Sequence, residues 1–419
     1  LEQYMIMGEL SLDGTLQPIQ GVLPMALAAR KAGFKGIILP EQNAREAAVV
    51  EGIDVYGLPN LQSVVRFLNG TETLLPTQVD TAAEFAQHAF TSDLDFSDVR
   101  GQENVRRAME VAAAGGHNML MVGPPGAGKS MMAKRLPSIL PPLNLEEALE
   151  TTKIYSVSGL MARRKESDGM SSALIVQRPF RSPHHTVTDV ALVGGGTNPH
   201  PGEISLAHNG VLFLDELPEY KRSALEVMRQ PLEDRKICIT RTKMTVEYPA
   251  SFMLVAAMNP CPCGHLGNAA LSCSRAPRCA EAYQNKISGP LLDRIDLHVD
   301  VDAVKPWEMT NDDSPRETSA EIRARVVAAR ERQITRQGRV NALLDGPELE
   351  RFAALTPELT TFLNTAAEKM GMSARGYNRI RRLARTIADL RGSEKIEMAD
   401  LTESLSYRPI NRGKYGVKL

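Results

Sequence analysis

The run Gly123-Pro124-Pro125-Gly126-Ala127-Gly128-Lys129-Ser130 has the residue types and spacing of a loop that binds a nucleoside triphosphate. Glycines let backbone N–H groups turn toward phosphate oxygens, and the N-terminus of a following helix adds partial positive charge. Lys129 would reach the β- and γ-phosphates, and Ser130 would ligate Mg²⁺. An apolar strand over 119–122 and a helix over 131–136 supply the required context, which disfavours a chance glycine-rich turn. We therefore expect ATP and Mg²⁺ as cofactors.

Two acids and an amide follow further apolar strands. Asp215 and Glu216 end the strand 211–214; Asp215 would hold Mg²⁺ through water, and Glu216 would polarise the attacking water as a general base. The alternative is a strand that happens to end in two acids. Asn259 ends the strand 253–258 and could orient that water or read the γ-phosphate, although asparagine is also a common turn residue.

Arg294 precedes a short strand over 297–301 and could serve a second active site. A guanidinium supplied in trans would stabilise the charge that develops on the γ-phosphate. The alternative is a surface salt bridge to Asp293 or Asp296, which would contribute little.

A helix is expected over 374–391, with Ser373 as its N-cap. Arg375, Arg379 and Arg382 recur at i, i+4 and i+7 and so share one face. Their unbalanced positive charge suits phosphate sensing or DNA binding, and a solvated basic face is the alternative.

These groups require a fold of several parts. Residues 96–305 alternate apolar strands and helices, which predicts an α/β core with a parallel sheet. Residues 1–70 read as a small α/β unit, 71–95 as a linker, 316–408 as a helical lid, and 409–419 as a basic tail.

Composition narrows the setting. The chain has 419 residues, 43% of them hydrophobic and 24% charged, as in ordinary globular proteins. No apolar run is long enough for a membrane span, and no secretion signal opens the chain. We therefore expect a cytoplasmic protein without a membrane partner, and its first residue, Leu1, suggests a natural N-terminus upstream. The net charge of −1 gives no global support for nucleic-acid binding, so such a surface must be local.

Four cysteines, Cys261, Cys263, Cys273 and Cys279, lie within a short stretch. Four thiolates would satisfy a structural Zn²⁺, but the C-x-C spacing departs from the usual C-x₂-C, and free thiols are the alternative.

Two segments are candidates for gripping DNA. The stretch 178–210 is rich in Arg, His and Gly, and its Arg181 could track a phosphate backbone. Strands over 236–240 and 244–248 form a hairpin whose tip carries Arg241 and Lys243. An ordered surface loop and a solvated tip are the alternatives. A metal role for His184-His185 is not expected, because adjacent side chains point apart and no carboxylate partner is evident.

Together these motifs resemble the magnesium-chelatase-like branch of the AAA+ ATPases. Arg178-Pro179-Phe180-Arg181-Ser182-Pro183-His184-His185 and Asn259-Pro260-Cys261-Pro262-Cys263-Gly264 are similar to the bacterial YifB/ComM family. The resemblance implies a homo-hexameric AAA+ DNA helicase that promotes branch migration on single-stranded or branched DNA in natural transformation or homologous recombination, with recombination proteins as further partners. A chelatase-like or chaperone-like remodeller of a protein, and a nucleotide-dependent switch or scaffold, remain as alternatives.

The resemblance also implies roles for individual residues. Asn259 becomes the first sensor, Arg294 the trans finger, and Arg375 the second sensor, with Arg379 as a second choice. Gln102, after Gly101, matches the place where such proteins cradle adenine.

Residues 1–70 resemble the C-terminal half of a Lon-protease-like domain. Val22-Leu23-Pro24-Met25 stands where such a protease carries its lysine, and the serine-bearing half is absent. We therefore expect a partial, proteolytically inactive domain that serves assembly or DNA binding.

Overall fold

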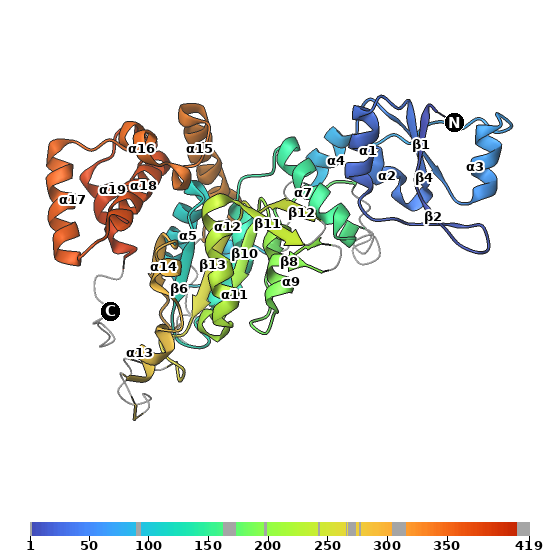
Figure 1. Ribbon diagram of the computed structural model, residues 1–419. Helices are drawn as coiled ribbons and strands as arrows, with labels where there is room; N and C mark the ends of the chain where they lie inside the picture. The colour runs from blue at the N-terminus through green and yellow to red at the C-terminus, as the bar shows by residue number, and fades with distance from the viewer. Residues whose placement is uncertain are drawn as a thin grey trace.

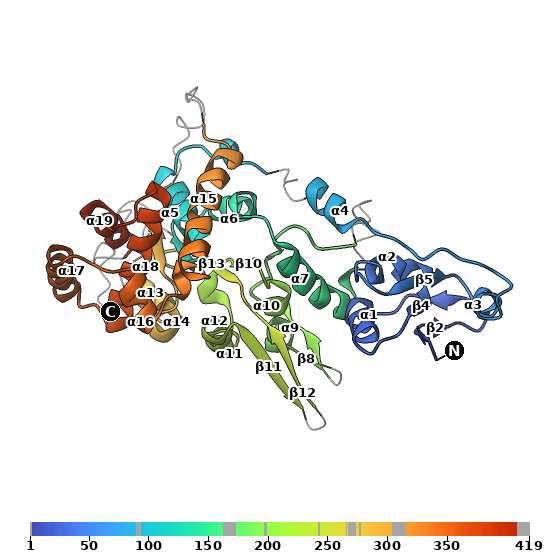
Figure 2. The same ribbon diagram turned by 90° about the horizontal axis from the view of Figure 1, so that it is seen from above.

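The computed structural model describes residues 2–88, 94–161, 173–196, 199–241, 244–264, 266, 274–275, 278–303 and 316–408. A central α/β core carries an N-terminal unit on one side and a group of C-terminal helices on the other, as Figures 1 and 2 show. The α/β core and the helical C-terminal part agree with the fold class expected from the sequence. None of the helices in the described ranges is long and apolar enough to cross a membrane.

A five-stranded parallel sheet forms the centre of the core. Its spatial order is β14-β6-β13-β10-β7. The first of these strands in the chain, β6, therefore lies between the last two, β13 and β14. The strands are β6 (Met119–Val122), β7 (Phe180–Arg181), β10 (Val211–Leu214), β13 (Met253–Met258) and β14 (Leu297–Asp300). The predicted parallel sheet is thus confirmed, and β6, β10 and β13 are the strands expected before the three polar motifs.

Alternate side chains of these strands enter two different apolar cores, because successive residues of a strand point to opposite faces. Met119, Met121 and Phe213 pack on one face with α5 and the first C-terminal helix. Leu120 and Leu212 pack on the other face. The covering helices and short 3₁₀ turns are α5 (Glu103–Gly115), α6 (Lys129–Arg135), η3 (Leu136–Ile139), α10 (Glu203–Leu206), η4 (Leu217–Glu219), α11 (Arg222–Val227), α12 (Arg229–Asp234), α13 (Arg278–Gln284) and α14 (Gly289–Leu292).

The long passage between the P-loop and Asp215 builds an extension of the core. It contains α7 (Leu145–Val157), α9 (Asp189–Val193), and a short hairpin of β8 (Gly194–Gly195) and β9 (His200–Pro201). The predicted second hairpin is confirmed as β11 (Lys236–Arg241) paired antiparallel with β12 (Met244–Pro249). Figure 2 shows β8 and the β11–β12 ribbon extending side by side from the core. The Tyr248 hydroxyl donates a hydrogen bond of 2.8 Å to the Pro199 carbonyl and joins the two hairpins.

The N-terminal unit contains a parallel sheet of order β1-β4-β5. Strands and helices alternate in it, as expected for a small α/β unit. Its elements are β1 (Tyr4–Ile6), β2 (Glu9–Leu10), β3 (Leu16–Gln17), α1 (Val22–Lys31), β4 (Gly36–Pro40), η1 (Glu41–Asn43), α2 (Ala44–Ala47), β5 (Asp54–Leu58) and α3 (Leu61–Leu68). The unit packs on α7 and on residues 173–176 through a shared apolar cluster.

The segment 71–95 is more than the expected linker. It includes α4 (Thr81–His88), whose start is capped by the Asp80 side chain, which accepts a hydrogen bond of 2.9 Å from the Ala83 amide. Glu84 of this helix forms an ion pair with Arg45 at 2.6 Å. These contacts explain the helix despite the polar composition. The basic tail 409–419 lies outside the described residues.

The C-terminal part is helical, as expected for a lid, and has its own apolar core. Within 316–408 every described element is a helix or a 3₁₀ turn: α15 (Ser319–Gln337), η6 (Asn341–Leu343), α16 (Gly346–Phe352), α17 (Pro357–Met370), α18 (Ala374–Arg391) and α19 (Met398–Ser406). Ser373 caps α18 as predicted, because its hydroxyl accepts a hydrogen bond of 3.2 Å from the Gly376 amide. α18 and α15 pack on α5, which joins the lid to the core.

Candidate active site

The P-loop follows the carboxyl end of β6 and turns into α6, as the motif requires. The Lys129 ammonium donates hydrogen bonds to the carbonyls of Gly123 and Pro124, at 2.7 and 2.9 Å, and to the side-chain oxygen of Asn259 at 3.1 Å. Burial lowers the pKa of Lys129 below its ordinary value. Gly126 has φ +76°, in the left-handed region that favours glycine. A phosphate bound at this loop would be close to the ammonium and to the N-terminus of α6.

Ser130 and Asp215 are in direct contact, although they come from β6–α6 and from the end of β10. The Ser130 hydroxyl donates a short hydrogen bond to the Asp215 carboxylate. Mg²⁺ prefers oxygen ligands and keeps several waters. This hydroxyl and carboxylate fit such an ion, and with ATP bound the ion would neutralise phosphate charge. The structure therefore brings the expected metal ligands together.

Glu216, the expected general base, has a strained backbone. Its φ of +52° is in the left-handed region that non-glycine residues seldom occupy, and its amide donates a hydrogen bond of 2.9 Å to the Asp215 carboxylate. Strain of this kind persists where the surrounding structure enforces it and is frequent at functional sites. The left-handed turn directs the two adjacent acids into separate roles, since Asp215 contacts Ser130 while the Glu216 side chain is half exposed.

His185 lies against Glu216, a relationship that the sequence prediction missed. The Nδ1 atom of His185 is 3.2 Å from Oε2 of Glu216. The expectation that this histidine pair has no carboxylate partner is therefore wrong. The reason is topological: β7 lies beside β10 in the sheet, so the residues after the two strands meet at one edge. The His184 and His185 rings also lie tilted against each other, with their centroids 4.1 Å apart, rather than pointing apart.

Two tyrosines lie near the acids. Burial raises the pKa of Tyr220, and the charges of Asp215 and Glu216 add to the rise. Burial, with the charge of Glu219 next, raises the pKa of Tyr283 to about 12. Both phenols therefore keep their protons at neutral pH, and that of Tyr220 donates a hydrogen bond of 2.6 Å to the Pro183 carbonyl.

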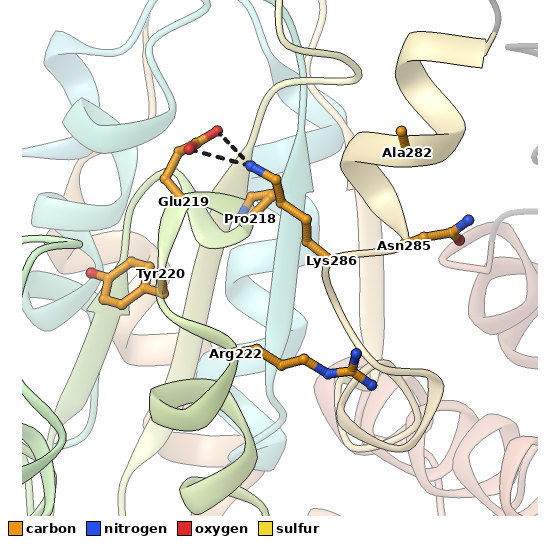
Figure 3. A pocket seen from close by; sticks show the side chains of 7 residues that line it. All are labelled: Pro218, Glu219, Tyr220, Arg222, Ala282, Asn285 and Lys286. Carbon is orange, nitrogen blue, oxygen red and sulfur yellow. Dashed lines mark hydrogen bonds and ion pairs between the residues drawn. The ribbon is translucent and has the colours of Figure 1, made fainter.

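Figure 3 shows the hollow beside this segment, lined by Pro218, Glu219, Tyr220, Arg222, Ala282, Asn285 and Lys286. The Tyr220 ring points away from Lys286 in that view. Lys286 and Glu219 form an ion pair at 3.4 Å, which ties η4 to the segment after α13. The segment that follows Glu216 is therefore held by two contacts, the Tyr220 hydrogen bond to Pro183 and the Lys286–Glu219 ion pair.

Arg294 lies at the end of the sheet where the strands begin, whereas the P-loop lies at the end where they finish. It precedes β14, whose Leu297 is in register with Met119 at the start of β6, whereas the P-loop follows the end of β6. Four strand residues at about 3.3 Å each separate the two edges by about 13 Å. The guanidinium bonds to Glu233 and donates to the Pro290 carbonyl at 2.6 Å. The alternative of a salt bridge from Arg294 to Asp293 or Asp296 is thus wrong. Asp293 pairs with Arg379, and Asp296 pairs with His117.

The three arginines of α18 do not form one solvated basic face. Arg379 is buried and donates to the Ile295 carbonyl at 2.8 Å and to Asp293 at 3.2 Å. Arg382 donates to the Leu344 carbonyl at 2.6 Å. Arg375 is exposed one turn before Arg379. Its role as the second sensor stays a prediction, while Arg379 fixes the lid to the loop of Arg294.

Gln102, expected near adenine, has φ +60° and begins α5. Its side-chain amide donates a hydrogen bond of 2.5 Å to the Asp302 carbonyl, just after β14. The residue joins two segments at the carboxyl edge of the sheet, where β6 also ends. Its role beside adenine stays a prediction.

The cysteine segment packs against the P-loop. A Cβ on Gly264 would lie 2.3 Å from Pro125, so Gly264 permits this approach. The sulfurs of Cys261 and Cys263 are 3.2 Å apart within an apolar cluster that Cys279 joins. Burial raises the pKa of the Cys261 thiol, and the bond with Cys263 adds to the rise.

The structure gives the expected zinc site no support. Cys273 lies outside the described residues, and among those that are described no three His, Cys, Asp or Glu side chains gather where they could hold a metal.

The candidate DNA residues have different surroundings. Arg181, on β7, forms a two-pronged pair with Glu203, with both distances 2.7 Å. The pair joins β7, an outer strand of the sheet, to α10. The role of Arg181 in DNA binding stays a prediction. Arg241 ends β11, where its backbone pairs with Met244, and Lys243 lies outside the described residues.

Sequence reasoning missed three relationships: His185 with Glu216, Arg294 with Glu233, and the buried His117, whose Nδ1 is 3.2 Å from Asp296. Each joins segments far apart in the chain. The strand order, once known, is the signal that could have found the first of them.

Comparison with known proteins adds a family to this geometry. The family described as "Magnesium chelatase, subunit ChlI" matches residues 95–309, its C-terminal family matches 316–408, and "Subunit ChlI of Mg-chelatase" matches 1–43.

Individual relatives agree with these matches. The chain is 43% identical to YifB of Escherichia coli over 413 residues, which cover 98% of the chain and 78% of that protein. It is 44% identical to "Competence protein ComM" of Haemophilus influenzae over 415 residues, 98% of the chain and 79% of that protein. It is 26% identical to Lon protease 2 of Bacillus subtilis over 191 residues, 40% of the chain and 33% of that protein, so the Lon resemblance is partial.

Proposed function

The chain belongs to the YifB and ComM group of magnesium-chelatase-like AAA+ proteins, and from that premise we propose that it is an ATP-driven DNA motor whose active sites form between protomers of a ring. One protomer supplies the P-loop, Asp215 and Glu216. The next supplies Arg294 and Arg375 to the same nucleotide. The reaction is hydrolysis of the γ-phosphate by a water that Glu216 activates while Mg²⁺ and Lys129 neutralise charge.

The position of Arg294 is the observation that carries this proposal. An arginine at the amino edge of the sheet is about 13 Å from the P-loop edge of its own chain, which is too far for a direct contact with bound phosphate. Arg379 binds the loop of Arg294 to α18, so Arg375 lies on the same side. A head-to-tail ring brings that side against the neighbour's P-loop. Six subunits are the number that the family resemblance suggests.

DNA is the substrate that we favour, because the ATPase core carries two adjoining hairpins that extend away from it. The sequence places Arg241 and Lys243 at the tip of one of them. Basic groups at such tips can follow a phosphate backbone as the ring moves. Branch migration during natural transformation or recombination fits the name of the competence relative, and the cytoplasm and recombination proteins complete this proposal.

A remodeller of a protein partner is the second candidate, because the matching families are described as chelatase subunits. Steady-state ATP hydrolysis separates the two. We expect forked and four-way DNA to increase the rate of ATP hydrolysis several-fold, and linear duplex to increase it less. Labelled four-way DNA should be dissociated into its component duplexes only when ATP is present. An unchanged rate, together with no retardation of any of these DNAs in a gel, would contradict the DNA motor and favour the remodeller.

A further inference from the structure

We propose that Cys261 and Cys263 form a redox-sensitive dithiol: a peroxide oxidises them to a disulfide, and the disulfide weakens ATP binding at the adjoining P-loop. The effect on ATP rests on the proposed function, since it regulates the same nucleotide site. The oxidation itself is a property of the two thiols, and it can be measured without ATP or DNA.

The two sulfur atoms are close enough to react with each other. They lie 3.2 Å apart, so a contraction of about 1 Å would bring them to the length of an S–S bond. The backbone already holds the two residues together in a tight turn, in which the Gly264 amide donates a hydrogen bond of 3.0 Å to the Cys261 carbonyl. Pro262 takes the second position of this turn, where its fixed φ is favourable.

The two thiols differ in exposure, which gives each a separate part in the reaction. Cys263 is partly exposed, whereas Cys261 is fully buried in a small apolar cluster with Ala280. Burial also raises the pKa of the Cys261 thiol and so keeps it protonated. A peroxide that arrives from solvent therefore meets Cys263 first, and Cys261 is the thiol that reacts with the product.

The oxidation balances with hydrogen peroxide as the oxidant. The Cys263 thiolate attacks one peroxide oxygen, the O–O bond breaks, and the products are a sulfenic acid and one water. The Cys261 sulfur then attacks the sulfenic sulfur, loses its proton, and displaces the hydroxyl as a second water. Two electrons pass from the thiols to the peroxide, and one S–S bond replaces two S–H bonds. Dithiothreitol reverses the change by thiol–disulfide exchange.

The dithiol lies between two parts of the nucleotide site. Asn259, which accepts a hydrogen bond from Lys129, precedes Cys261 by two residues. On the other side, Gly264 packs so closely on the P-loop that an added Cβ would be 2.3 Å from the Pro125 ring. Because packed atoms of this kind leave little free space, a contraction of the turn is transmitted to the loop that binds phosphate.

A third contact limits how the turn can respond. The Gln284 side-chain amide, at the end of α13, donates a hydrogen bond of 2.8 Å to the Pro260 carbonyl. The residue before the dithiol is therefore anchored on α13. Contraction of the turn then moves its other end, which carries Gly264 and contacts the P-loop.

The first test identifies the disulfide. The protein is treated with hydrogen peroxide, the remaining thiols are alkylated, and its peptides are analysed by mass spectrometry. We expect the peptide that contains Cys261 and Cys263 to lose two hydrogens and to regain them with dithiothreitol. The exposed Cys238, on β11, should not join the pair. Two intact thiols after treatment, or a disulfide from either residue to another cysteine, would overturn the dithiol.

The second test measures the affinity for a fluorescent ATP analogue before and after oxidation. We expect peroxide to weaken binding by the wild type about three- to tenfold, the worth of one displaced hydrogen bond, and dithiothreitol to restore it. Cys263→Ser and Cys261→Ala cannot form the disulfide, so each should bind ATP equally well with and without peroxide. Cys238→Ser keeps the pair and should respond as the wild type does.

The outcomes for the redox control and for the DNA motor are distinct. A disulfide that leaves the affinity of the wild type for ATP unchanged overturns the control, and so does an equal loss of affinity in Cys263→Ser. These measurements contain no DNA, so a wild type that DNA fails to stimulate contradicts the motor alone. A reduced wild type that binds no ATP contradicts the nucleotide site, and the peptide analysis still decides whether the dithiol exists.

Discussion

The Lys129 ammonium lies 3.1 Å from the side-chain oxygen of Asn259, although 130 positions separate the two residues. They meet because β6 and β13 are neighbouring parallel strands, with Met258 in register with Val122. A cation and an amide at one edge of the sheet can both contact a single γ-phosphate. The nucleotide site thus follows from the strand order as much as from the P-loop motif.

Replacement of Lys129 by Ala should abolish tight ATP binding. The ammonium is buried and would pair with phosphate charge in a partly desolvated site, so we expect a loss of affinity of at least about 100-fold. Titration with a fluorescent ATP analogue measures it. Lys134→Ala, on the exposed side of α6, is the matched control and should bind normally. Equal affinities for the two variants would contradict the assignment.

Replacement of Glu216 by Gln should preserve ATP binding and remove turnover. Gln cannot accept a proton from water, so kcat should fall about 10²- to 10⁴-fold, the usual worth of a general base. Glu226→Gln, on α11 in the same region, should hydrolyse ATP at the wild-type rate. Normal turnover in the Glu216 variant would refute its role as the base.

Arg375 and Arg379 should differ in what they affect. Arg379 is buried against Asp293 and the Ile295 carbonyl, so Arg379→Ala should lower the melting temperature by several degrees. Arg375 is exposed, so Arg375→Ala should leave the melting temperature within about one degree and lower kcat about tenfold or more. The reverse pattern in calorimetry and ATPase assays would assign the sensor to Arg379.

Asp296 should make stability depend on pH. Burial alone would raise its pKa, but the hydrogen bond with His117 and the charges of Arg379 and Arg382 outweigh burial and hold the pKa below 3.8. Its stabilising contribution is therefore complete above about pH 5 and is lost as the pH falls through the ordinary pKa toward the lowered folded-state pKa.

Asp296→Asn should accordingly lower the melting temperature at neutral pH by about 5–10 °C, since it removes one partner of a buried charge pair. The difference from the wild type should shrink as the pH is lowered from about 5 toward 3. Thermal unfolding over that range, with the exposed Asp302→Asn as control, measures both effects. A difference independent of pH would show that the charge of Asp296 is irrelevant.

The local features were the predictable ones. Strand–loop–helix context located the P-loop, and an apolar run ending in acids located β10 and Glu216, because both signals lie within a few residues. The cap at Ser373 and the hairpin 236–248 were predictable for the same reason. The helix α4 was missed because its polar, mixed sequence has weak periodicity, and its contacts with Arg45 and residues 173–176 come from elsewhere in the chain.

The side-chain partnerships were not predictable from spacing. Arg379 was expected on a basic face, yet it is buried, because the carbonyls and the carboxylate that bind it come from the loop 292–295. Similarly, the partner of Arg294 is Glu233 on α12 rather than an adjacent aspartate. Such contacts depend on how helices settle on the sheet, which periodicity alone does not specify.

The most direct measurement of the shared-site mechanism is complementation between two inactive variants, Glu216→Gln and Arg294→Ala. Each alone should hydrolyse ATP at less than about one hundredth of the wild-type rate. In an equal mixture of reassembled rings, about a quarter of the interfaces would join an intact Glu216 to an intact Arg294 from the neighbour, so activity should return to a substantial fraction of the wild-type rate. A mixture that stays as inactive as its parents, although both variants assemble and exchange subunits, would contradict an active site built from two protomers.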